Sequence, residues 1–177
     1  MKRLILFIIF LGFYKFTYSQ IIEEWKSESM SNGDVPKCIK HNPKYNFTLN
    51  NFLRIKIGGK CDAIIKLINY NTGECIRIVF VKANNEYEMK YIPEGKYYVK
   101  VAFGNDYKVL IDSFGCQGRF FNNTTFFQGT EILDYFLIKI GNKIQVPSYE
   151  IILETKTKDK KNRFHTEKIT EEEFYNE

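Results

Sequence analysis

Hydrophobic and polar residues alternate with a period close to two along much of the chain. The alternation is clearest in three stretches, residues 53–57, 86–91 and 97–103. Such a pattern is typical of an antiparallel strand that buries one face and exposes the other. Residues 63–69 and 75–82 are instead dense in isoleucine and valine, as strands in the middle of a sheet tend to be. The pattern therefore predicts a sheet-forming chain.

Turn-forming residues separate the predicted strands. Residues 71–74 (Asn-Thr-Gly-Glu) contain Asn and Gly, which tolerate the positive φ that hairpin connections often need. In residues 92–95 (Ile-Pro-Glu-Gly), Pro fixes φ at the first central position of a turn and Gly suits its exit. A further turn is expected at residues 104–106 and a hairpin tip at 122–125. Additional strands are then expected at three places, residues 107–112, 134–140 and 149–154.

Short strands at spacings of roughly 8 to 12 residues, with almost no helical periodicity, indicate an all-β fold. We expect an antiparallel β-sandwich of about 7–9 strands, although the pattern also allows a barrel. The sandwich domain is expected at residues 46–154, after an irregular lead-in at 20–45. Residues 155–177 are expected to be a charged tail outside the core, and the spacing of Thr170 and Glu173 fits the capping box of a short helix.

The first 19 residues have the pattern of a cleaved secretory signal. An apolar run at residues 4–13 follows two basic residues. Thr17 and Ser19 then place small side chains three and one positions before Gln20. A membrane-spanning helix needs about 20 apolar residues, whereas Lys15 interrupts this run after roughly a dozen. We therefore expect a protein that is exported to the periplasm or secreted after cleavage near Ser19 and Gln20, with no membrane span in its mature form.

The charge of the chain changes once the signal is set aside. The 177 residues are 44% hydrophobic, enough for one domain with a real core, and 26 Lys and Arg against 21 Asp and Glu give a formal charge of +5. Lys2, Arg3 and Lys15 belong to the signal, so 23 basic residues face 21 acidic ones and the exported form carries +2. A surplus this small and dispersed is not the footprint of a nucleic-acid-binding protein.

The four cysteines, Cys38, Cys61, Cys75 and Cys116, form an even set in a chain expected to reach an oxidising compartment. Cys61 and Cys75 are expected at opposite ends of one hairpin, roughly 20 Å apart, whereas a disulfide requires Cα atoms within about 7 Å. The Cys61–Cys75 bridge is thus disfavoured, which leaves the two pairings that join separate parts of the chain, or reduced buried thiols. A zinc site is not indicated, since Cys38 and His41 have no matching second pair of ligands.

Residues 62–104 resemble the transthyretin-like β-sandwich group, and within it the carboxypeptidase regulatory-like domains of exported bacterial proteins. The resemblance rests on two hydrophobic strands joined by Thr72-Gly73-Glu74, a polar alternating strand, and the pattern I-P-x-G-x-Y at residues 92–97. The glycine-rich opening strand of that group is missing and is replaced by residues 51–59. Such domains are typically non-catalytic stabilising or interaction modules. The resemblance therefore implies that role and supplies no catalytic residue.

Sequence motifs for catalysis are missing. There is no G-x-S-x-G elbow, glycine-rich phosphate loop, H-E-x-x-H pair or acidic calcium loop. A serine or cysteine nucleophile would need His41 or His165 as its base, and these lie in a loop between prolines and in the charged tail. We expect no enzyme, cofactor or metal, but an exported interaction or structural module that contacts a protein or another envelope component. A small hydrolase that uses carboxylates alone is the weakest alternative.

Aromatic residues give the candidate binding surface. Two Phe-Phe pairs flank residues 122–125, with one arginine close by. Adjacent residues of a strand point to opposite sides, so about half of each pair must point inward. The other half could expose a platform for a partner or for a sugar ring, which makes a carbohydrate-binding module the alternative function. The candidate surface residues are Arg119, Phe121, Phe126 and Phe127.

Overall fold

The structure is a computed structural model that describes residues 24–39, 41–154 and 164–176. The expected signal segment, residues 1–19, lies outside the described residues, as does part of the expected charged tail. The described chain forms mostly strands, and the strand pairs are antiparallel with one exception, which confirms the all-β class with antiparallel sheets. The described part contains no helix long and apolar enough to cross a membrane.

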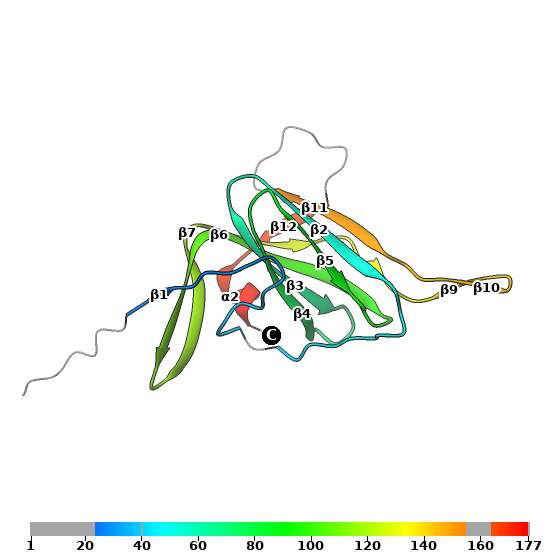
Figure 1. The fold of residues 1–177 in the computed structure, drawn as a ribbon, viewed down its shortest axis with the longest axis horizontal. Helices are drawn as coiled ribbons and strands as arrows, with labels where there is room; N and C mark the ends of the chain where they lie inside the picture. Colours follow the sequence, from blue (N-terminus) through cyan, green and yellow to red (C-terminus); the bar gives the residue numbers. More distant parts are fainter. Residues whose placement is uncertain (1–23, 40, 155–163, 177) are drawn as a thin grey trace, which may run out of the picture.

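The larger sheet has the strand path β12-β7-β6-β3-β4, while β1 and β8 pair with opposite ends of β6 (Figure 1). Its strands are β1 (Lys26–Ser27), β3 (Asp62–Asn69), β4 (Cys75–Val81), β6 (Lys96–Asp112), β7 (Gly115–Gly129), β8 (Leu133–Asp134) and β12 (Thr166–Ile169). The smaller sheet has the order β11-β2-β5, and its strands are β2 (Phe52–Gly58), β5 (Glu86–Lys90) and β11 (Tyr149–Glu154). The parallel pair is β11 with β2.

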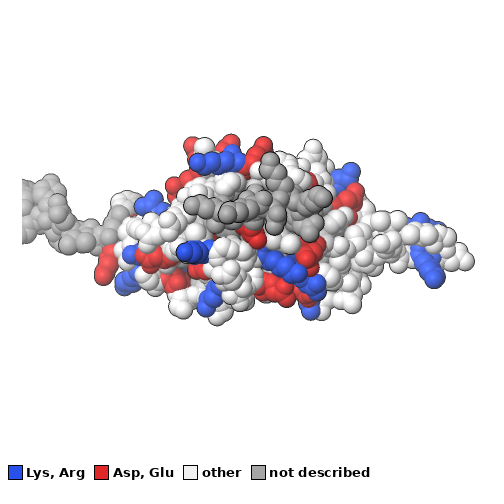
Figure 2. Space-filling view, turned by 90° about the horizontal axis from the view of Figure 1, so that it is seen from above, with Lys and Arg blue, Asp and Glu red and all other residues white. Residues whose placement is uncertain are grey.

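A separate hairpin of β9 (Ile138–Ile140) and β10 (Lys143–Gln145) projects from the body (Figure 1). The sequence predicted one strand over residues 134–140, but the structure divides this stretch between β8 and β9. Asp134 ends β8 and its carboxylate accepts a hydrogen bond from the backbone N–H of Phe136, a local turn that interrupts the strand. Basic and acidic side chains are interspersed over the face seen in Figure 2.

The β6–β7 hairpin is longer than the sequence predicted, and its turn lies elsewhere. The expected turn at residues 104–106 lies inside β6, where the register with β7 shifts between Phe103 and Asn105. Gly104 suits the close crossing there, because a Cβ at that position would lie 2.4 Å from the Phe120 side chain. The expected tip at residues 122–125 is a β-bulge within β7, where Asn123 and Thr124 oppose Gly104 alone and Asn123 has a φ of 55°. The observed tip follows Asp112, whose carboxylate accepts hydrogen bonds from the backbone N–H groups of Phe114 and Gly115.

Two hydrophobic clusters lie on the two faces of the larger sheet. The first fills the space between the two sheets with alternate residues of their strands, among them Leu53, Ile55, Ile65, Leu67, Val99, Val101, Ile151 and Leu153. The second lies on the opposite face and includes Met30, Ile64, Ile78, Phe80, Ala102, Phe120, Phe126 and Phe174. Strand β3 therefore buries both of its faces, which explains its nearly continuous apolar sequence.

The chain's two described ends cover the second cluster. On one side, the N-terminal segment follows the edge of β4 through backbone hydrogen bonds, from Gly33 to the carbonyl of Phe80 and from Lys44 to that of Ile76. On the other side lies the short helix α2 (Glu171–Tyr175), which begins with the expected capping box of Thr170 and Glu173. The segment expected to be an irregular lead-in thus packs along the edge strand β4 of the larger sheet.

Helix α2 is fastened to the sheet by an aromatic residue and two buried lysines. Phe174 is fully buried in the second cluster. Lys66, only 2% exposed, donates a hydrogen bond to the carbonyl of Phe174 at 2.8 Å, and Lys100 donates one to that of Glu173 at 2.6 Å. These carbonyls end the helix and have no partner within it. The prediction that the charged tail lies outside the core is therefore wrong for α2.

Candidate functional site

The outer halves of β6 and β7 extend beyond the sheet as a two-stranded arm, residues 105–122 (Figure 1). Strand β1 runs along its edge, with Ser27 opposite Lys108. Lys108 in turn stands opposite Arg119 of β7. Because residues opposite one another in antiparallel strands share a face, the two cations lie side by side on the arm.

Four residues of the arm and of the segment before β1 form an aromatic–cation cluster, consisting of Trp25, Lys108, Arg119 and Phe121. The guanidinium carbon of Arg119 lies 4.8 Å from the centre of the Trp25 ring and 5.3 Å from that of Phe121. The ammonium of Lys108 lies 5.0 Å from the Phe121 ring. A guanidinium is attracted to the faces of aromatic rings and loses little of its hydrogen-bonding capacity there. The cluster therefore holds Arg119 in place while its N–H groups stay available.

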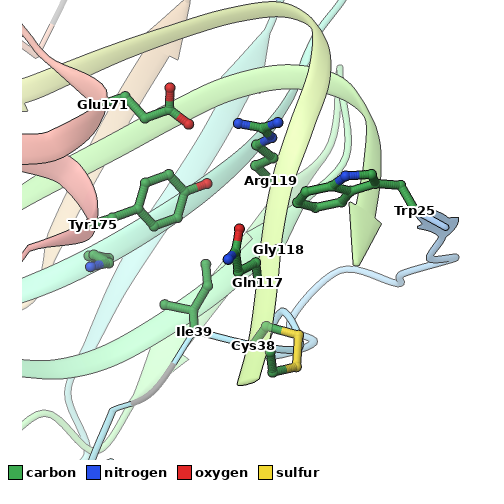
Figure 3. Close-up of a pocket in the computed structure, with 10 residues that line it drawn as sticks. Trp25, Cys38, Ile39, Gln117, Gly118, Arg119, Glu171 and Tyr175 are labelled. Carbon is green, nitrogen blue, oxygen red and sulfur yellow. A yellow bond between two sulfur atoms is a disulfide. The ribbon is translucent and has the colours of Figure 1, made fainter. Parts of the chain in front are cut away.

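Beside this cluster is a pocket of about 480 Å³ between β7, the N-terminal segment and α2, which we call the α2 pocket (Figure 3). Its lining residues are Trp25, Cys38, Ile39, Lys66, Cys116, Gln117, Gly118, Arg119, Glu171 and Tyr175. The Cys38–Cys116 disulfide forms part of its wall and ties the N-terminal segment to β7. The side chains of Arg119, Glu171 and Tyr175 point toward one another across it (Figure 3).

Polar groups in the α2 pocket lack partners within the described chain. The side chains of Trp25, Gln117, Arg119 and Glu171 make no hydrogen bond or ion pair with any described residue. The hydroxyl of Tyr175 is buried and also has no partner there. Gln117, Arg119 and Glu171 are exposed and reach water, whereas buried polar groups such as the Tyr175 hydroxyl are nearly always paired in folded proteins, so this exception calls for an explanation. A ligand that supplies the missing hydrogen bonds would provide one.

Electrostatics keep the Tyr175 phenol neutral. Burial raises its pKa above the ordinary value of 10, the carboxylate of Glu171 adds to the rise, and the Arg119 guanidinium opposes it. A neutral phenol both donates and accepts a hydrogen bond. With Arg119 as a donor and Glu171 as an acceptor, the pocket offers both kinds of hydrogen-bonding group within a small space.

The structure divides the four predicted surface residues. Arg119 and the 40% exposed Phe121 lie together in the aromatic–cation cluster. Phe126 is 8% exposed and packs against Phe174 in the second cluster, so it is not a surface residue. Phe127 packs against the first cluster and lines a separate cavity near Cys61. The alternation of β7 sends Phe126 to one face of the sheet and Phe127 to the other.

Several pocket residues were missed by the sequence analysis. Glu171 and Tyr175 belong to a stretch expected to be a solvated tail, and Trp25 belongs to the expected irregular lead-in. Trp25 is the single tryptophan of the chain, which was a usable signal. Gln117 lies two positions before Arg119 in the sequence, and no pattern in the sequence marks it as a pocket residue.

The cysteines form neither of the two pairings left open, and the third alternative, reduced buried thiols, holds for two of the four. The structure has one disulfide, Cys38–Cys116, with the Cα atoms 5.0 Å apart, while Cys61 and Cys75 are buried free thiols. The expected separation of Cys61 from Cys75 agrees with the register of β3 and β4, which places them at opposite ends of the hairpin. The predicted pairings of Cys38 with Cys61 or with Cys75 are therefore wrong, because Cys38 is bonded to Cys116 and the other two cysteines stay reduced.

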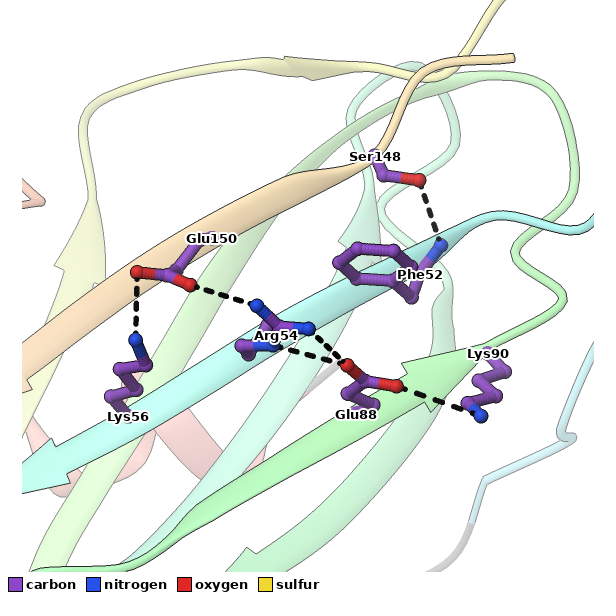
Figure 4. A network of polar contacts seen from close by, with 7 residues as sticks. All are labelled: Phe52, Arg54, Lys56, Glu88, Lys90, Ser148 and Glu150. Atoms are coloured by element: carbon purple, nitrogen blue, oxygen red, sulfur yellow. Dashed lines mark hydrogen bonds and ion pairs between the residues drawn. The ribbon is translucent and has the colours of Figure 1, made fainter.

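The outer face of the smaller sheet is a second polar surface, and there charges pair with one another (Figure 4). Arg54 of β2 contacts Glu88 of β5 at 2.6 Å and Glu150 of β11 at 3.3 Å. Lys56 contacts Glu150 at 3.0 Å, and Lys90 contacts Glu88 at 3.5 Å. We call these five residues the charged row. The hydrogen bond from Arg54 lowers the pKa of Glu88, and that from Lys56 is the main cause of the lowered pKa of Glu150.

Neither histidine is among the residues that line the α2 pocket. His165 contacts Glu131 through its Nδ1 atom at 2.7 Å, and both side chains are exposed. Within residues 24–39, 41–154 and 164–176, no group of three or more His, Cys, Asp or Glu side chains is placed to hold a metal ion. A scan against protein-family models finds no matching family, and searches of curated proteins and of solved structures find no match either.

Proposed function

We propose that this protein is an exported, non-catalytic β-sandwich protein that acts as an interaction module at the cell envelope, with the α2 pocket as its binding site. The hydrophobic cluster shared by the two sheets supports the proposal of a sandwich. The resemblance of residues 62–104 to transthyretin-like domains supports the same role.

The observation that carries this proposal is the convergence of unpaired polar side chains in the α2 pocket. Trp25, Arg119 and Tyr175 come from the beginning, the middle and the end of the described chain. A disulfide, an aromatic–cation cluster and a fastened helix hold them in position before any ligand arrives. Preorganisation of this kind reduces the entropy cost of binding, which is characteristic of a binding site.

Export has two supports. The first residues have the pattern of a secretory signal, and the described chain contains a disulfide. Disulfides form and persist in oxidising compartments and are rare in the cytosol. We therefore place the protein in the periplasm or outside the cell, where a protein or another envelope component is its partner.

The carboxylates favour binding over hydrolysis. Glycoside hydrolysis by acids requires two carboxyl groups flanking the scissile bond. Glu171 is the one carboxylate among the described residues that line the α2 pocket. The carboxylates of Glu88 and Glu150 are instead engaged by Arg54, and their lowered pKa values oppose a role as general acid.

An affinity pull-down tests the proposal. Mature protein that starts at Gln20 is immobilised and exposed to the native envelope fraction, and captured components are identified by mass spectrometry. We expect Arg119→Gln to lose the captured partner. Its matched control Arg54→Gln, an arginine of the charged row, is expected to keep it. The proposal fails if Arg119→Gln captures the same components in the same amounts as the unmodified protein.

The alternative of a carbohydrate-binding platform takes a different form in this structure. A flat platform needs coplanar exposed rings, but Trp25 and Phe121 meet edge to face at an interplanar angle of 65°. The carbohydrate alternative therefore rests on the α2 pocket, where polar groups surround one aromatic side chain.

A further inference from the structure

We infer that the α2 pocket binds a neutral saccharide, whose hydroxyl groups hydrogen-bond to Gln117, Arg119, Glu171 and Tyr175 and whose apolar ring face packs against Trp25. The inference rests on the proposed function of the pocket as a binding site and names the class of its ligand.

The charge of the pocket favours a neutral ligand. Arg119 and Glu171 face one another across the space without forming an ion pair (Figure 3). An anion attracted by Arg119 meets the carboxylate of Glu171, and a cation attracted by Glu171 meets the guanidinium. The remaining cation in the lining, Lys66, directs its ammonium to the carbonyl of Phe174. A ligand that carries no net charge avoids both repulsions.

The hydrogen-bonding groups match hydroxyls. Arg119 and the indole N–H of Trp25 are donors only, the ionised carboxylate of Glu171 is an acceptor only, and Gln117 and Tyr175 offer both functions. A ligand that satisfies all of them must present donors and acceptors close together on one small body. Each hydroxyl of a sugar is both a donor and an acceptor, so neighbouring hydroxyls of one ring meet this demand.

The walls and the size of the pocket agree with such a ligand. Apolar surface comes from Trp25, Ile39 and the Cys38–Cys116 disulfide, so a face of C–H groups has a place to pack. The volume of about 480 Å³ lies within the range of pockets that bind small molecules, about 300–1,000 Å³. An acidic peptide is the competing ligand, because it would be attracted by Arg119 and Lys66, but it would also be repelled by the carboxylate of Glu171.

Trp25 supplies a direct readout, because it is the single tryptophan of the chain and lines the pocket. Its fluorescence is followed while glucose, galactose, mannose and N-acetylglucosamine are titrated into the mature protein, and the same protein is applied to a glycan array. A Glu-rich peptide serves as the competing probe. We expect a saturable change in fluorescence with at least one neutral sugar and none with the peptide.

Two variants separate the pocket from other surfaces. Tyr175→Phe removes a hydroxyl that has no partner within the described protein, so the melting temperature should not fall, while sugar affinity should drop about 3- to 10-fold. Glu171→Gln removes a charged acceptor and should weaken binding about 10-fold or more. Arg54→Gln, in the charged row, should leave the affinity unchanged. If Tyr175→Phe does not fold, Glu171→Gln on the exposed start of α2 still provides the test.

Three results would overturn the inference. The first is that no neutral sugar binds on the array or in titration. The second is that a sugar binds but Glu171→Gln and Tyr175→Phe leave its affinity unchanged, which would place the sugar elsewhere. The third is that the Glu-rich peptide changes Trp25 fluorescence while every sugar fails. In this third case the pocket remains a binding site and the proposed function stands, whereas that function fails by itself if the envelope pull-down is insensitive to Arg119→Gln.

Discussion

Two arginines on this protein have opposite surroundings. Arg54 lies in the charged row, where Glu88 and Glu150 accept its hydrogen bonds from neighbouring strands (Figure 4). Arg119 lies between the rings of Trp25 and Phe121 and meets no carboxylate within 4 Å among the described residues. The side chains of the charged row form ion pairs with one another, whereas Arg119 and Glu171 of the α2 pocket form none with any described residue. Charge on a surface is therefore a weaker guide to function than whether that charge already has a partner.

The two regions also differ in how they are assembled. The charged row needs only the register of three neighbouring strands, since β5, β2 and β11 place its residues opposite one another. The α2 pocket needs a disulfide across 78 residues of sequence and a helix from the end of the chain. It follows that damage to these long-range fastenings should remove the pocket and leave the charged row in place.

Removal of the Phe174 side chain, which fastens α2 to the sheet, should cause the largest loss in the free energy of unfolding. Phe174→Ala empties a fully buried site in the second cluster, so we expect a loss of about 3–5 kcal/mol in the free energy of unfolding. Urea denaturation followed by circular dichroism measures the loss. Phe114→Ala, at a side chain that is 92% exposed, is the control and should change stability by less than about 0.5 kcal/mol. Equal stability of the two variants would show that α2 does not pack as described.

Removal of the disulfide should have the next largest effect. The double variant Cys38→Ser with Cys116→Ser frees a long loop in the unfolded chain, which costs about 2–4 kcal/mol. The same urea denaturation measures it, and Trp25 fluorescence should shift because the segment that carries the indole is released from β7. Reduction of the unmodified protein with dithiothreitol is the control and should reproduce both changes. A reduced protein with unchanged stability would contradict the role of the bridge.

The variants Arg54→Gln and Arg119→Gln should have smaller effects on stability and should differ in whether they capture the partner. Arg54→Gln removes ion pairs of the charged row, so its urea midpoint should fall slightly, and the fall should shrink in high salt. Arg119→Gln breaks no ion pair with a described residue but loses the cation–π contacts with Trp25 and Phe121, so its midpoint should also fall slightly while capture of the partner is lost. If Arg119→Gln lost stability but still captured the partner, Arg119 would be a structural residue only.

The smallest expected effect is on the acid side of the stability curve. Hydrogen bonds lower the folded pKa of Glu88 and Glu150 in the charged row, and of Glu173 in the capping box of α2, below the ordinary value of 4.5. A lowered folded pKa means that the stabilisation is fully present above 4.5 and is lost as the pH falls through the folded pKa. Urea midpoints measured from pH 6 downward should therefore begin to fall below about 4.5, and Arg54→Gln should make that fall shallower. A parallel pH profile for Arg54→Gln would contradict the role of the row.

The sheet was predictable from the sequence because its cause is local. Alternation at residues 53–57 and 97–103 and the dense stretches at 63–69 and 75–82 give the strands and most of their inward faces. The turn prediction failed at residues 104–106 and 122–125, where Gly and Asn residues are typical of turns. Pairing between two long strands prevailed there, and β7 accommodates its extra residue as a bulge opposite Gly104.

The candidate site was predictable only in part because its causes are distant in sequence. Arg119 and Phe121 lie on one strand and could be found from the aromatic pattern. Glu171 and Tyr175 reach the pocket only through the burial of Phe174, a lone apolar residue in a charged stretch whose composition indicates solvent exposure. The Cys38–Cys116 bridge likewise depends on the N-terminal segment packing against β7, which the spacing of the cysteines in the sequence does not reveal.

The position of α2 has a consequence for biosynthesis. Helix α2 is translated after every strand of the larger sheet, and it covers the face of that sheet where Ile64, Ile78 and Phe80 are buried. A nascent or truncated chain without Phe174 exposes this apolar surface even when the strands of the sheet have already formed. The second cluster can therefore close only after α2 has been synthesised, and until then its apolar surface is open to aggregation. A truncation that removes α2 should leave this surface exposed.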